Sequence, residues 1–257
     1  MGKLSVIIIT HNEAHDIRRC LESVRFADEI VVFDSGSIDG TQAICREYTK
    51  KVFETDWPGF GAQKNRALQQ ATGEWILSLD ADEWVSDSLK LEIIEVLHAG
   101  KENAYCIPCR IVCFGRIIKH GASQKSPLRL FKKSLGKFDN AIIHEKVVID
   151  GRIGRLSSLL FHETYCDLDE MLEKLNRYTT VAAQRRLQEG RVDHLAMVLL
   201  NSLWVFFRSY FLKFGFLDGE AGFILAVANA EYCYYRYLKL AALRRNPPLP
   251  LFHQGGE

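Results

Sequence analysis

The stretch Trp75-Ile-Leu-Ser-Leu-Asp80-Ala-Asp82-Glu83 places two carboxylates, one residue apart, at the end of an apolar run. The run predicts a buried strand. Because side chains alternate along a strand, Asp80 and Asp82 are expected to point to the same side. Two like charges at this spacing repel each other, and Mg²⁺ is commonly held by one or two carboxylates together with substrate phosphates. The stretch therefore indicates a metal-bridged phosphate compound, although a solvated loop can carry the same Asp-x-Asp.

Apolar runs alternate with helical patterns over the first hundred residues, which predicts an α/β fold with a doubly wound, mostly parallel sheet flanked by helices. In such sheets ligands bind outside the carboxyl ends of the strands. Three polar segments, Thr10–Glu13, Asp34–Asp39 and Asp80–Glu83, follow predicted strands and are expected to meet there. The predicted strands are Leu4–Ile9, Glu29–Phe33, Val52–Glu54 and Trp75–Leu79, and the predicted helices are Ala14–Val24, Thr41–Tyr48, Ala62–Ala71 and Ser86–Leu97.

Beyond residue 100 the pattern changes from strands to helices. From Asp167 the spacing predicts a helix with one stripe of Leu168, Leu172, Leu175 and Thr179, beside Met171 and Tyr178. We expect three parts: a ligand-binding α/β domain at 1–165, an amphipathic helical region at 166–243, and a tail at 244–257. Further strands are predicted at Ala104–Lys119 around a Phe114-Gly115 turn, and at Leu128–Phe131, Ala141–Ile149 and Ser158–His162.

The charge balance argues against a dedicated nucleic-acid binder, because the net charge is only +1. The charge is unevenly spread. Residues 1–100 carry 10 Lys and Arg against 17 Asp and Glu, whereas residues 101–150 carry 10 against 4. A basic segment after an acidic one would suit an anionic acceptor, and a solvated basic face would account for it equally well.

Seven cysteines without a secretory signal pattern suggest reduced thiols in a cytoplasm. Cys106-Ile-Pro-Cys109 permits a redox or zinc interpretation, but no second Cys-x-x-Cys completes a four-ligand site. The longest uncharged C-terminal stretch runs from Leu195 to Phe207, which is short of the ~20 apolar residues of a membrane-spanning helix.

Four motifs follow one another along the first third of the chain: Ser5-Val-Ile-Ile-Ile-Thr-His-Asn-Glu13, Val32-Phe-Asp34-Ser-Gly-Ser-Ile-Asp39-Gly-Thr41, Lys64-Asn65-Arg-Ala67 and Leu79-Asp80-Ala-Asp82-Glu83. In this order and spacing they resemble glycosyltransferase family 2, whose members have the GT-A fold. Four further segments are Trp57-Pro-Gly-Phe-Gly-Ala-Gln-Lys64, Arg129-Leu-Phe131, His144-Glu145 and Phe216-Leu-Asp-Gly-Glu-Ala-Gly222. With them the chain resembles bacterial lipopolysaccharide core glycosyltransferases, in particular those that add β-1,4-glucose to an inner-core heptose.

The resemblance implies a metal-dependent enzyme that transfers one sugar with inversion, with UDP-glucose as the expected donor. By the resemblance, Asp82 ligates Mg²⁺ or Mn²⁺ at the diphosphate, and Asp80 reaches the ribose and metal region. Asp34 would contact the uracil or ribose, Asp39 would support that loop, and Lys64 would lie near the nucleotide. The nucleotide pocket would be lined by Thr10, Asn12 and Glu13.

Inversion requires a base that takes the proton of the acceptor hydroxyl. In this superfamily it is a carboxylate downstream of the Asp-x-Asp, so Glu145 is the first candidate, with Asp139 and then Glu83 as alternatives. Its neighbour His144, and Arg129, are candidates for contacting the acceptor or the diphosphate. A surface pair within a strand would also account for His144-Glu145.

The acceptor implied is a lipid-linked core oligosaccharide, which places the enzyme on the cytoplasmic face of a Gram-negative inner membrane. Lys and Arg between the aromatic residues of 195–243 suit helices lying in a membrane interface, but packing against the α/β domain would also explain them. Two other functions remain open: sugar transfer to a polyprenyl phosphate, and non-catalytic binding of a sugar nucleotide.

Overall fold

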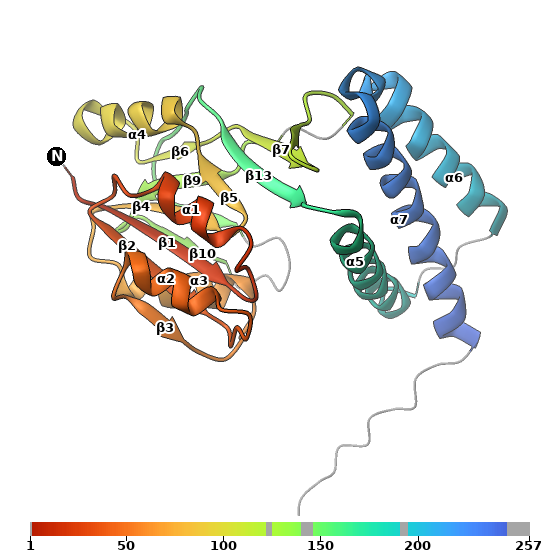
Figure 1. Ribbon diagram of the computed structural model, residues 1–257, viewed down its shortest axis with the longest axis horizontal. Helices are drawn as coiled ribbons and strands as arrows, with labels where there is room; N and C mark the ends of the chain where they lie inside the picture. The colour runs from red at the N-terminus through yellow and green to blue at the C-terminus, as the bar shows by residue number, and fades with distance from the viewer. Residues whose placement is uncertain (1, 122–124, 140–145, 191–194, 246–257) are drawn as a thin grey trace, which may run out of the picture. The chain divides into compact units, whose positions relative to one another are not determined.

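The computed structural model describes residues 2–121, 125–139, 146–190 and 195–245. They fold into an α/β sheet unit and a helical unit (Figure 1). The strands are β1 (Leu4–Thr10), β2 (Glu29–Asp34), β3 (Val52–Glu54), β4 (Trp75–Asp80), β5 (Glu83–Val85), β6 (Ala104–Cys106), β7 (Cys109–Cys113), β8 (Arg116–Ile117), β9 (Leu128–Lys132), β10 (Gly136–Phe138), β11 (Val147–Ile149), β12 (Ile153–Arg155) and β13 (Leu160–Tyr165). The helices are α1 (Ile17–Ser23), α2 (Thr41–Tyr48), α3 (Phe60–Gln70), α4 (Asp87–Ala99), α5 (Leu168–Gln188), α6 (Leu195–Phe207), the π-helical turn η1 (Arg208–Leu212), the 3₁₀ turn η2 (Gly215–Asp218) and α7 (Gly219–Arg245).

A seven-stranded sheet in the order β12-β6-β9-β4-β1-β2-β3 forms the centre of the sheet unit. β9 runs antiparallel to its neighbours β4 and β6, and the other pairs are parallel. The register aligns Thr10 with Asp34, and Ile9 with Asp80. The polar ends of β1, β2 and β4 therefore meet at one edge, as the sequence predicts.

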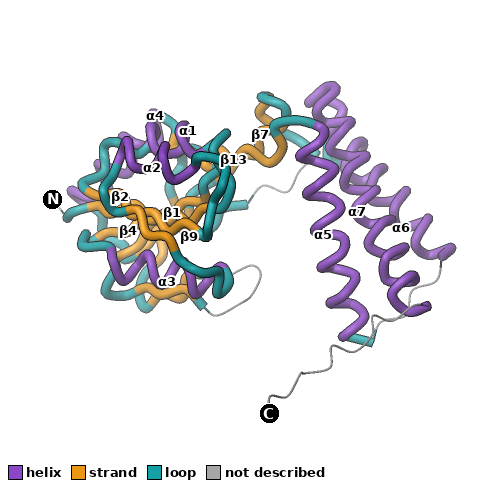
Figure 2. Tube along the Cα trace, turned by 60° about the horizontal axis from the view of Figure 1, so that its bottom comes forward, coloured by secondary structure: helices purple, strands orange, loops and turns teal. Residues whose placement is uncertain are grey.

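Helices cover both faces of this sheet, because alternate side chains of the buried strands point in opposite directions. Val6 and Ile8 pack in one core with α1, α2 and α4, whereas Ile7 and Ile9 pack in the other with α3 and the β10–β11 hairpin. Figure 2 shows α3 on the opposite side of the sheet from the other three helices. The doubly wound arrangement is confirmed.

Glu29 ties together the amino ends of neighbouring elements. Its carboxylate accepts hydrogen bonds from Ser5 of β1 and from Lys51 before β3. It also accepts from the backbone N–H of Thr72 (2.7 Å) and from the Thr72 hydroxyl (3.0 Å), in the turn before β4. One half-buried carboxylate thus fixes the ends opposite the ligand-binding edge.

Several elements differ from the predicted ones. Helix α1 begins only at Ile17, because Glu13–Asp16 forms a turn whose first carbonyl accepts from the N–H groups of Asp16 and Ile17. The sequence analysis missed β5, β10 and β12, each of three residues, which is too short for an alternation pattern to register. Of the predicted strand Ala141–Ile149, residues 140–145 lie outside the described residues.

The predicted stripe of α5 is partly wrong. Leu175 and Thr179 are buried, but Leu168, Leu172 and Tyr178 are exposed. The buried stripe continues instead through Met171 and Ala183. Spacing alone left two neighbouring stripes to choose from, and the packing of α7 beside α5 selects between them.

The helical unit consists of Val112–Ser123 and the chain from Tyr165 onward, so that it includes a loop that the predicted division at residue 165 assigns to the first domain. Lys239 of α7 donates to the carbonyl oxygen of Asn176 (2.6 Å) and to the hydroxyl of Thr179 (2.9 Å) in α5. Helix α7 ends at Arg245, and residues 246–257 of the predicted tail lie outside the described residues.

The helical backbone extends beyond the uncharged stretch Leu195–Phe207, because the π-helical turn η1 follows α6 directly and reaches Leu212. Within the described ranges, Leu195–Leu212 is the single helical stretch whose length and mean hydropathy (18 residues, 1.5) would allow it to cross a membrane. Length and composition alone are weak evidence that a helix crosses a membrane. However, only 11% of this stretch is buried, whereas the core helix of a soluble protein is mostly buried.

The Glu29 contacts predict a pH-dependent contribution to stability. Burial alone would raise the pKa of Glu29, but hydrogen bonds from Lys51, Ser5 and Thr72 outweigh it and lower the pKa to about 2. The stabilisation is therefore complete above the unfolded-state pKa of about 4.5 and is lost as the pH falls toward 2. At 1.36 kcal/mol per pKa unit, the lowering from 4.5 to about 2 corresponds to about 3.4 kcal/mol. Solvent screening at this partly exposed pair reduces the effect, so we expect Glu29→Gln to lower the free energy of unfolding by about 2–3 kcal/mol at pH 7.

Urea denaturation at pH 7 and at pH 3 measures this effect. The difference between wild type and Glu29→Gln should shrink at the lower pH. The exposed Glu54→Gln serves as the matched control and should lie within about 0.5 kcal/mol of wild type at both values. An equal loss for Glu29→Gln at the two pH values would contradict the assignment.

Candidate functional site

The first two loops at the carboxyl edge are joined to each other. The backbone N–H of Asn12 donates to Ser37 Oγ (2.8 Å), and Asn12 Oδ1 accepts from the N–H of Ile38 (2.9 Å). Asn12 has a φ of 55°, in the left-handed region that asparagine tolerates better than most residues. The N–H of Glu13 donates to Thr41 Oγ1 (2.8 Å). Asn12 and Glu13 thus lie at the predicted edge and shape it.

Asp34 holds the second loop from below. It is fully buried, and Oδ1 accepts from the N–H of Ser37 (2.9 Å) and from Gln42 Nε2 (2.7 Å), while Oδ2 accepts from the Ser37 hydroxyl (2.5 Å). Its oxygens are therefore engaged within the protein. The predicted contact of Asp34 with uracil or ribose stays a prediction and would require these bonds to be shared.

Asp39 supports the same loop, as the resemblance implies. Oδ1 accepts from the hydroxyl of Thr41 (2.6 Å), and Oδ2 accepts from the N–H of Ala14 (3.0 Å) in the first loop. Burial raises the pKa of Asp39, but these hydrogen bonds more than offset it and lower the pKa below its usual range. Nearby, the Oγ1 of Thr10 is buried without a hydrogen-bond partner in the described part of the chain.

Two buried cations flank Asp80. Lys64 Nζ lies 2.8 Å from Oδ1, and Arg129 Nη2 lies 2.7 Å from Oδ2. Lys64, on α3, is only 2% exposed, whereas the Asp80 side chain remains 37% exposed. Burial would raise the pKa of Asp80, but attraction to Arg129 and Lys64 lowers it far below its usual range. Asp80 is therefore an ionised, accessible carboxylate, and Lys64 contacts it from below instead of offering an open cation.

Glu83 completes this charge network. It is 2% exposed, Oε1 lies 2.5 Å from Arg129 Nη2, and Oε2 accepts from the backbone N–H of Asp80 (3.0 Å). Burial raises the pKa of Glu83 despite Arg129. Glu83 was the third candidate for the catalytic base. Because both of its carboxylate oxygens face inward, it is a poor candidate for that role. Arg129 is likewise committed to these two carboxylates.

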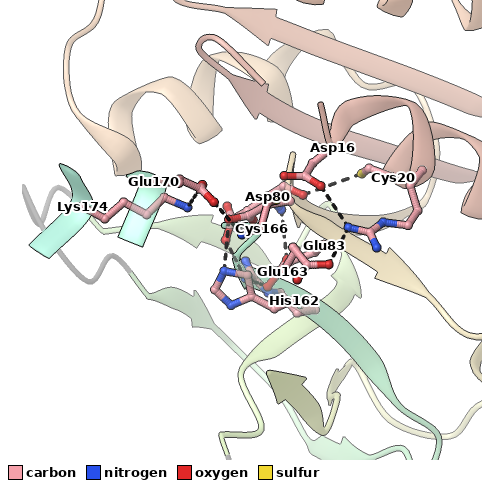
Figure 3. A network of polar contacts seen from close by, with 12 residues as sticks. Asp16, Cys20, Asp80, Glu83, His162, Glu163, Cys166, Glu170 and Lys174 are labelled. Carbon is pink, nitrogen blue, oxygen red and sulfur yellow. Dashed lines mark hydrogen bonds and ion pairs between the residues drawn. The ribbon is translucent and has the colours of Figure 1, made fainter. Parts of the chain in front are cut away.

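Asp82 lies apart from this network. Strand β4 ends at Asp80, and Ala81-Asp82 forms a turn into β5, so Asp82 lies outside the strand and strand alternation does not set its direction. Asp82 Oδ2 instead lies 3.1 Å from His162 Nε2 of β13, which pairs with β5 opposite Glu83. Figure 3 shows His162 with Asp80 and Glu83 around it.

The sequence analysis missed His162. Its local sequence contains no spacing motif, and only the pairing of β13 with β5 brings it across 80 residues to Asp82. Burial lowers the pKa of His162, but hydrogen bonds to Asp82 and Cys109 raise it to about 11. Cys109, from the Cys-x-x-Cys pattern, thus lies with His162 and Glu83, whose ligand atoms fall within 4.8 Å of one another.

The donor set suits a divalent cation. Asp80 and Asp82 offer carboxylate oxygens at least partly open to solvent, and His162 offers an imidazole nitrogen. Oxygen ligands suit Mg²⁺ and Mn²⁺, and imidazole is accepted by first-row transition metals. These side-chain types suit the metal that the sequence resemblance implies, but the described residues around His162 whose ligand atoms lie within 4.8 Å of one another are Glu83, Cys109 and His162, not Asp80 with Asp82.

The hairpin β10–β11 frames the remaining candidates. Asn65 clamps it to α3, since Nδ2 donates to the carbonyl oxygen of Phe138 (2.9 Å) and Oδ1 accepts from the N–H of Phe138 (3.0 Å). The backbone N–H of Asp139 donates to the carbonyl oxygen of Lys146 (3.0 Å), and its Oδ1 accepts from the Lys146 N–H (3.1 Å). His144 and Glu145 lie outside the described residues.

Comparison with known proteins identifies the family. Residues 5–149 match the model for glycosyl transferase family 2. The lipopolysaccharide core biosynthesis glycosyltransferase LpsC of Rhizobium meliloti is 30% identical over 92% of this chain and 91% of that protein. An uncharacterized glycosyltransferase of Rickettsia felis is 30% identical over 96% of this chain and 91% of its own length.

One solved structure extends the comparison to the fold. S. aureus TarS 1–349 in complex with UDP-GlcNAc superposes with a TM-score of 0.50 at 18% identity, covering 95% of this chain and 92% of that one. At this identity the likeness concerns the fold alone.

The ion pair between the buried Lys64 and the partly exposed Asp80 predicts strong coupling between the two residues. Removing the ammonium in Lys64→Met leaves the Asp80 carboxylate with one cation fewer, and we expect the free energy of unfolding to fall by about 3 kcal/mol. Asp80→Asn should cost at least as much, because it leaves the Lys64 ammonium, which is only 2% exposed, without its carboxylate. The double variant should be more stable than the sum of the single losses predicts, by at least about 1 kcal/mol. Urea denaturation of all four proteins measures the coupling, and additive losses would refute it.

Proposed function

The chain belongs to glycosyltransferase family 2, and we propose that this enzyme transfers one sugar, with inversion, from a UDP-sugar to a lipid-linked core oligosaccharide of lipopolysaccharide. The observation that carries the proposal is the meeting of Asp82 and His162 beside the accessible Asp80, at the carboxyl edge where the two nucleotide-side loops are locked together. The similarity to LpsC along nearly the whole chain supports the acceptor class.

Donor binding is assigned to the loops at this edge. Thr10, Asn12 and Glu13 line the nucleotide pocket, and Asp34 and Asp39 keep the second loop in place against the base and ribose. Asp80, held by Lys64 and Arg129, faces the ribose and diphosphate side. Because Lys64 and Arg129 already hold the Asp80 carboxylate in place, it needs little reorganisation when the donor binds. Such preorganised groups stabilise the transition state more effectively.

Mg²⁺ or Mn²⁺ would be held by Asp82 and His162, with Asp80 at its side. When bound, the metal supplies positive charge that offsets the negative charge developing on the UDP leaving group. His162 must give up its proton to become a ligand. Asp82 also fixes the orientation of the imidazole through the 3.1 Å contact between its Oδ2 and His162 Nε2.

The transfer itself is a single displacement. The acceptor hydroxyl oxygen forms a bond with the anomeric carbon of the sugar while the bond from that carbon to the diphosphate oxygen breaks, which inverts the configuration. The hydroxyl proton passes to a carboxylate base. We assign this role to Glu145, with Asp139 as the alternative, because Glu83 has both oxygens turned inward.

Glucose from UDP-glucose, placed on an inner-core heptose, is the donor and acceptor pair that the narrower resemblance favours. Such an acceptor is anchored in the cytoplasmic face of the inner membrane, so the enzyme would work at that surface. Transfer to a polyprenyl phosphate is the second candidate. One apolar helix that could cross a membrane favours it, whereas the similarity to LpsC favours the core acceptor.

The base assignment is tested with isosteric amides. Glu145→Gln removes the proton acceptor but keeps the size of the side chain, so we expect transfer to fall at least about 10³-fold while the affinity for the UDP-sugar changes less than twofold. Asp139→Asn is the matched variant, because its amide oxygen can still accept from the N–H of Lys146 and keep the hairpin closed. Loss of transfer in Asp139→Asn alone would move the base to Asp139.

The metal assignment predicts weaker binding of Mn²⁺ in the presence of UDP. We expect Asp82→Asn and His162→Gln each to reduce Mn²⁺ affinity at least about tenfold by isothermal titration calorimetry. The exposed Asp56→Asn is the control and should bind as wild type does. Unchanged affinity in both site variants would place the metal elsewhere.

Donor and acceptor are identified by UDP release from a panel of UDP-sugars with Mn²⁺. We expect release to depend on added core lipopolysaccharide that lacks the transferred sugar, and to be fastest with UDP-glucose. Release that requires polyprenyl phosphate instead would establish the second candidate.

A further inference from the structure

Helix α6 and its continuation η1 carry their apolar side chains on the outside. Val198 and Val205 form the inward seam, against Cys233 and Tyr237 of α7. At about 100° per residue, the opposite face of the helix should be polar in a soluble protein. It is apolar instead. Leu199, Leu200, Leu203, Trp204, Phe207 and Phe211 lie there with exposed fractions of 45–67%.

This face is too large to be ordinary surface scatter. Residues 195–223 contain 13 of the 26 large apolar side chains that are exposed among the described residues. Contiguous apolar patches above a few hundred Å² mark interaction sites or membrane contacts. We call the exposed side of Leu195–Leu217 the apolar platform.

The end of the apolar platform is held in a fixed shape. Phe214 has a φ of 57°, an unfavourable conformation for a bulky residue, and its side chain is 55% exposed instead of packed. The Asp218 carboxylate accepts from the backbone N–H of Lys119 (3.1 Å) and of His120 (2.7 Å), which clasps the turn to a neighbouring loop. The carbonyl of Lys213 accepts from the N–H of Gly121 (2.8 Å). The protein thus keeps an aromatic turn pointing outward at a cost in local strain.

The charges on the apolar platform have one sign. Between Leu195 and Leu217 the chain carries Arg208 and Lys213 and no acidic residue. A basic rim beside apolar and aromatic side chains complements an anionic lipid surface, where each basic residue contributes about 1 kcal/mol. If the platform instead bound the same platform on a second copy of the chain, across a two-fold axis, Arg208 and Lys213 would face only the same basic residues and no acidic partner. The charge pattern therefore favours lipid over self-association.

Lying in the interface fits the neighbouring helices better than crossing the bilayer does. The 18-residue helix is long enough to cross, at 1.5 Å per residue. However, α6 packs along α7, and α7 packs along α5. Those two helices carry Glu173, Arg177 and Arg236, and a crossing α6 would draw such charges toward hydrocarbon at about 3 kcal/mol each.

We propose that the apolar platform binds the surface of an anionic phospholipid bilayer, with Leu200, Leu203 and Phe207 inserted among the lipids and Arg208 and Lys213 at the headgroups. This deepens the membrane-surface location proposed above and rests on it only for the identity of the acceptor. The binding itself requires neither donor nor metal.

Flotation of the full chain with vesicles tests the proposal. We expect binding to vesicles of phosphatidylcholine with 30% phosphatidylglycerol to be at least about tenfold tighter than to phosphatidylcholine alone, and to weaken as salt is raised. Combining Leu200→Gln, Leu203→Gln and Phe207→Gln should weaken binding at least about tenfold. Combining Arg208→Gln with Lys213→Gln should abolish most of the preference for the anionic vesicles.

The matched control removes three equally exposed apolar side chains from α4 and α5: Leu91→Gln, Leu168→Gln and Leu172→Gln. It should bind vesicles as wild type does. Circular dichroism shows whether the triple variant folds. If it does not, a second platform variant, Phe214→Gln with Leu217→Gln, tests the same surface.

Three results would overturn the proposal: no vesicle binding by wild type, unchanged binding in both platform variants, or retention of wild type in vesicles after alkaline carbonate, which marks a spanning helix. Self-association that the platform variants abolish, without vesicle binding, would identify a second copy as the occupant. Vesicle binding is measured without a sugar nucleotide. If the protein binds vesicles but never releases UDP, the glycosyltransferase proposal fails and this one stands.

Discussion

The candidate site depends on a carboxylate that is kept ionised and accessible by cations beneath it. Asp80 ends the central strand β4, and Lys64 from α3 and Arg129 from β9 reach it from two different elements. Glu83 balances Arg129 and returns to the backbone of Asp80. A buried ion pair of this kind adds little net stability, since desolvation offsets much of the attraction, but breaking it is expensive. The main effect of the network is therefore to fix the positions of its side chains, because moving one of them would leave its partners without a counter-charge.

Around this centre, polar side chains are used mainly to hold backbone in place. The carboxylate oxygens of Asp34 and Asp39 accept hydrogen bonds from backbone N–H groups of two loops, and Asn12 joins those loops to each other. Asn65 does the same for the hairpin β10–β11, whose two strands flank the candidate bases in the sequence. Fixing this many loop segments before a ligand arrives lowers the ordering cost of binding. The remaining accessible groups, Asp80, Asp82 and His162, are then free to meet the ligand.

Most of the fold followed from the sequence, and less of the site did. The strands β1, β2 and β4 were recognisable as continuous apolar runs. Because these strands are parallel, the residues that follow them lie at the same edge of the sheet. The separate roles of Asp34, Lys64 and Asp80 could not be predicted, because they depend on burial and on distant partners, such as Arg129, which lies 49 residues from Asp80 in the sequence. The stripe of α5 was misread for the same reason: two stripes have the same spacing, and only a neighbouring helix chooses.

By itself, the sequence determined the order of strands and helices, the family motifs and the acidic residues at the strand ends, because these depend on local periodicity and residue type. The tertiary structure alone decided that Ala81 turns the chain, so that Asp82 leaves Asp80 and meets His162 across the β5–β13 pair. It also decided that η1 continues the helical backbone of α6 to Leu212, with the apolar face outward. Strand pairing and helix packing join residues distant in sequence, and no local pattern records which distant partner an element will have.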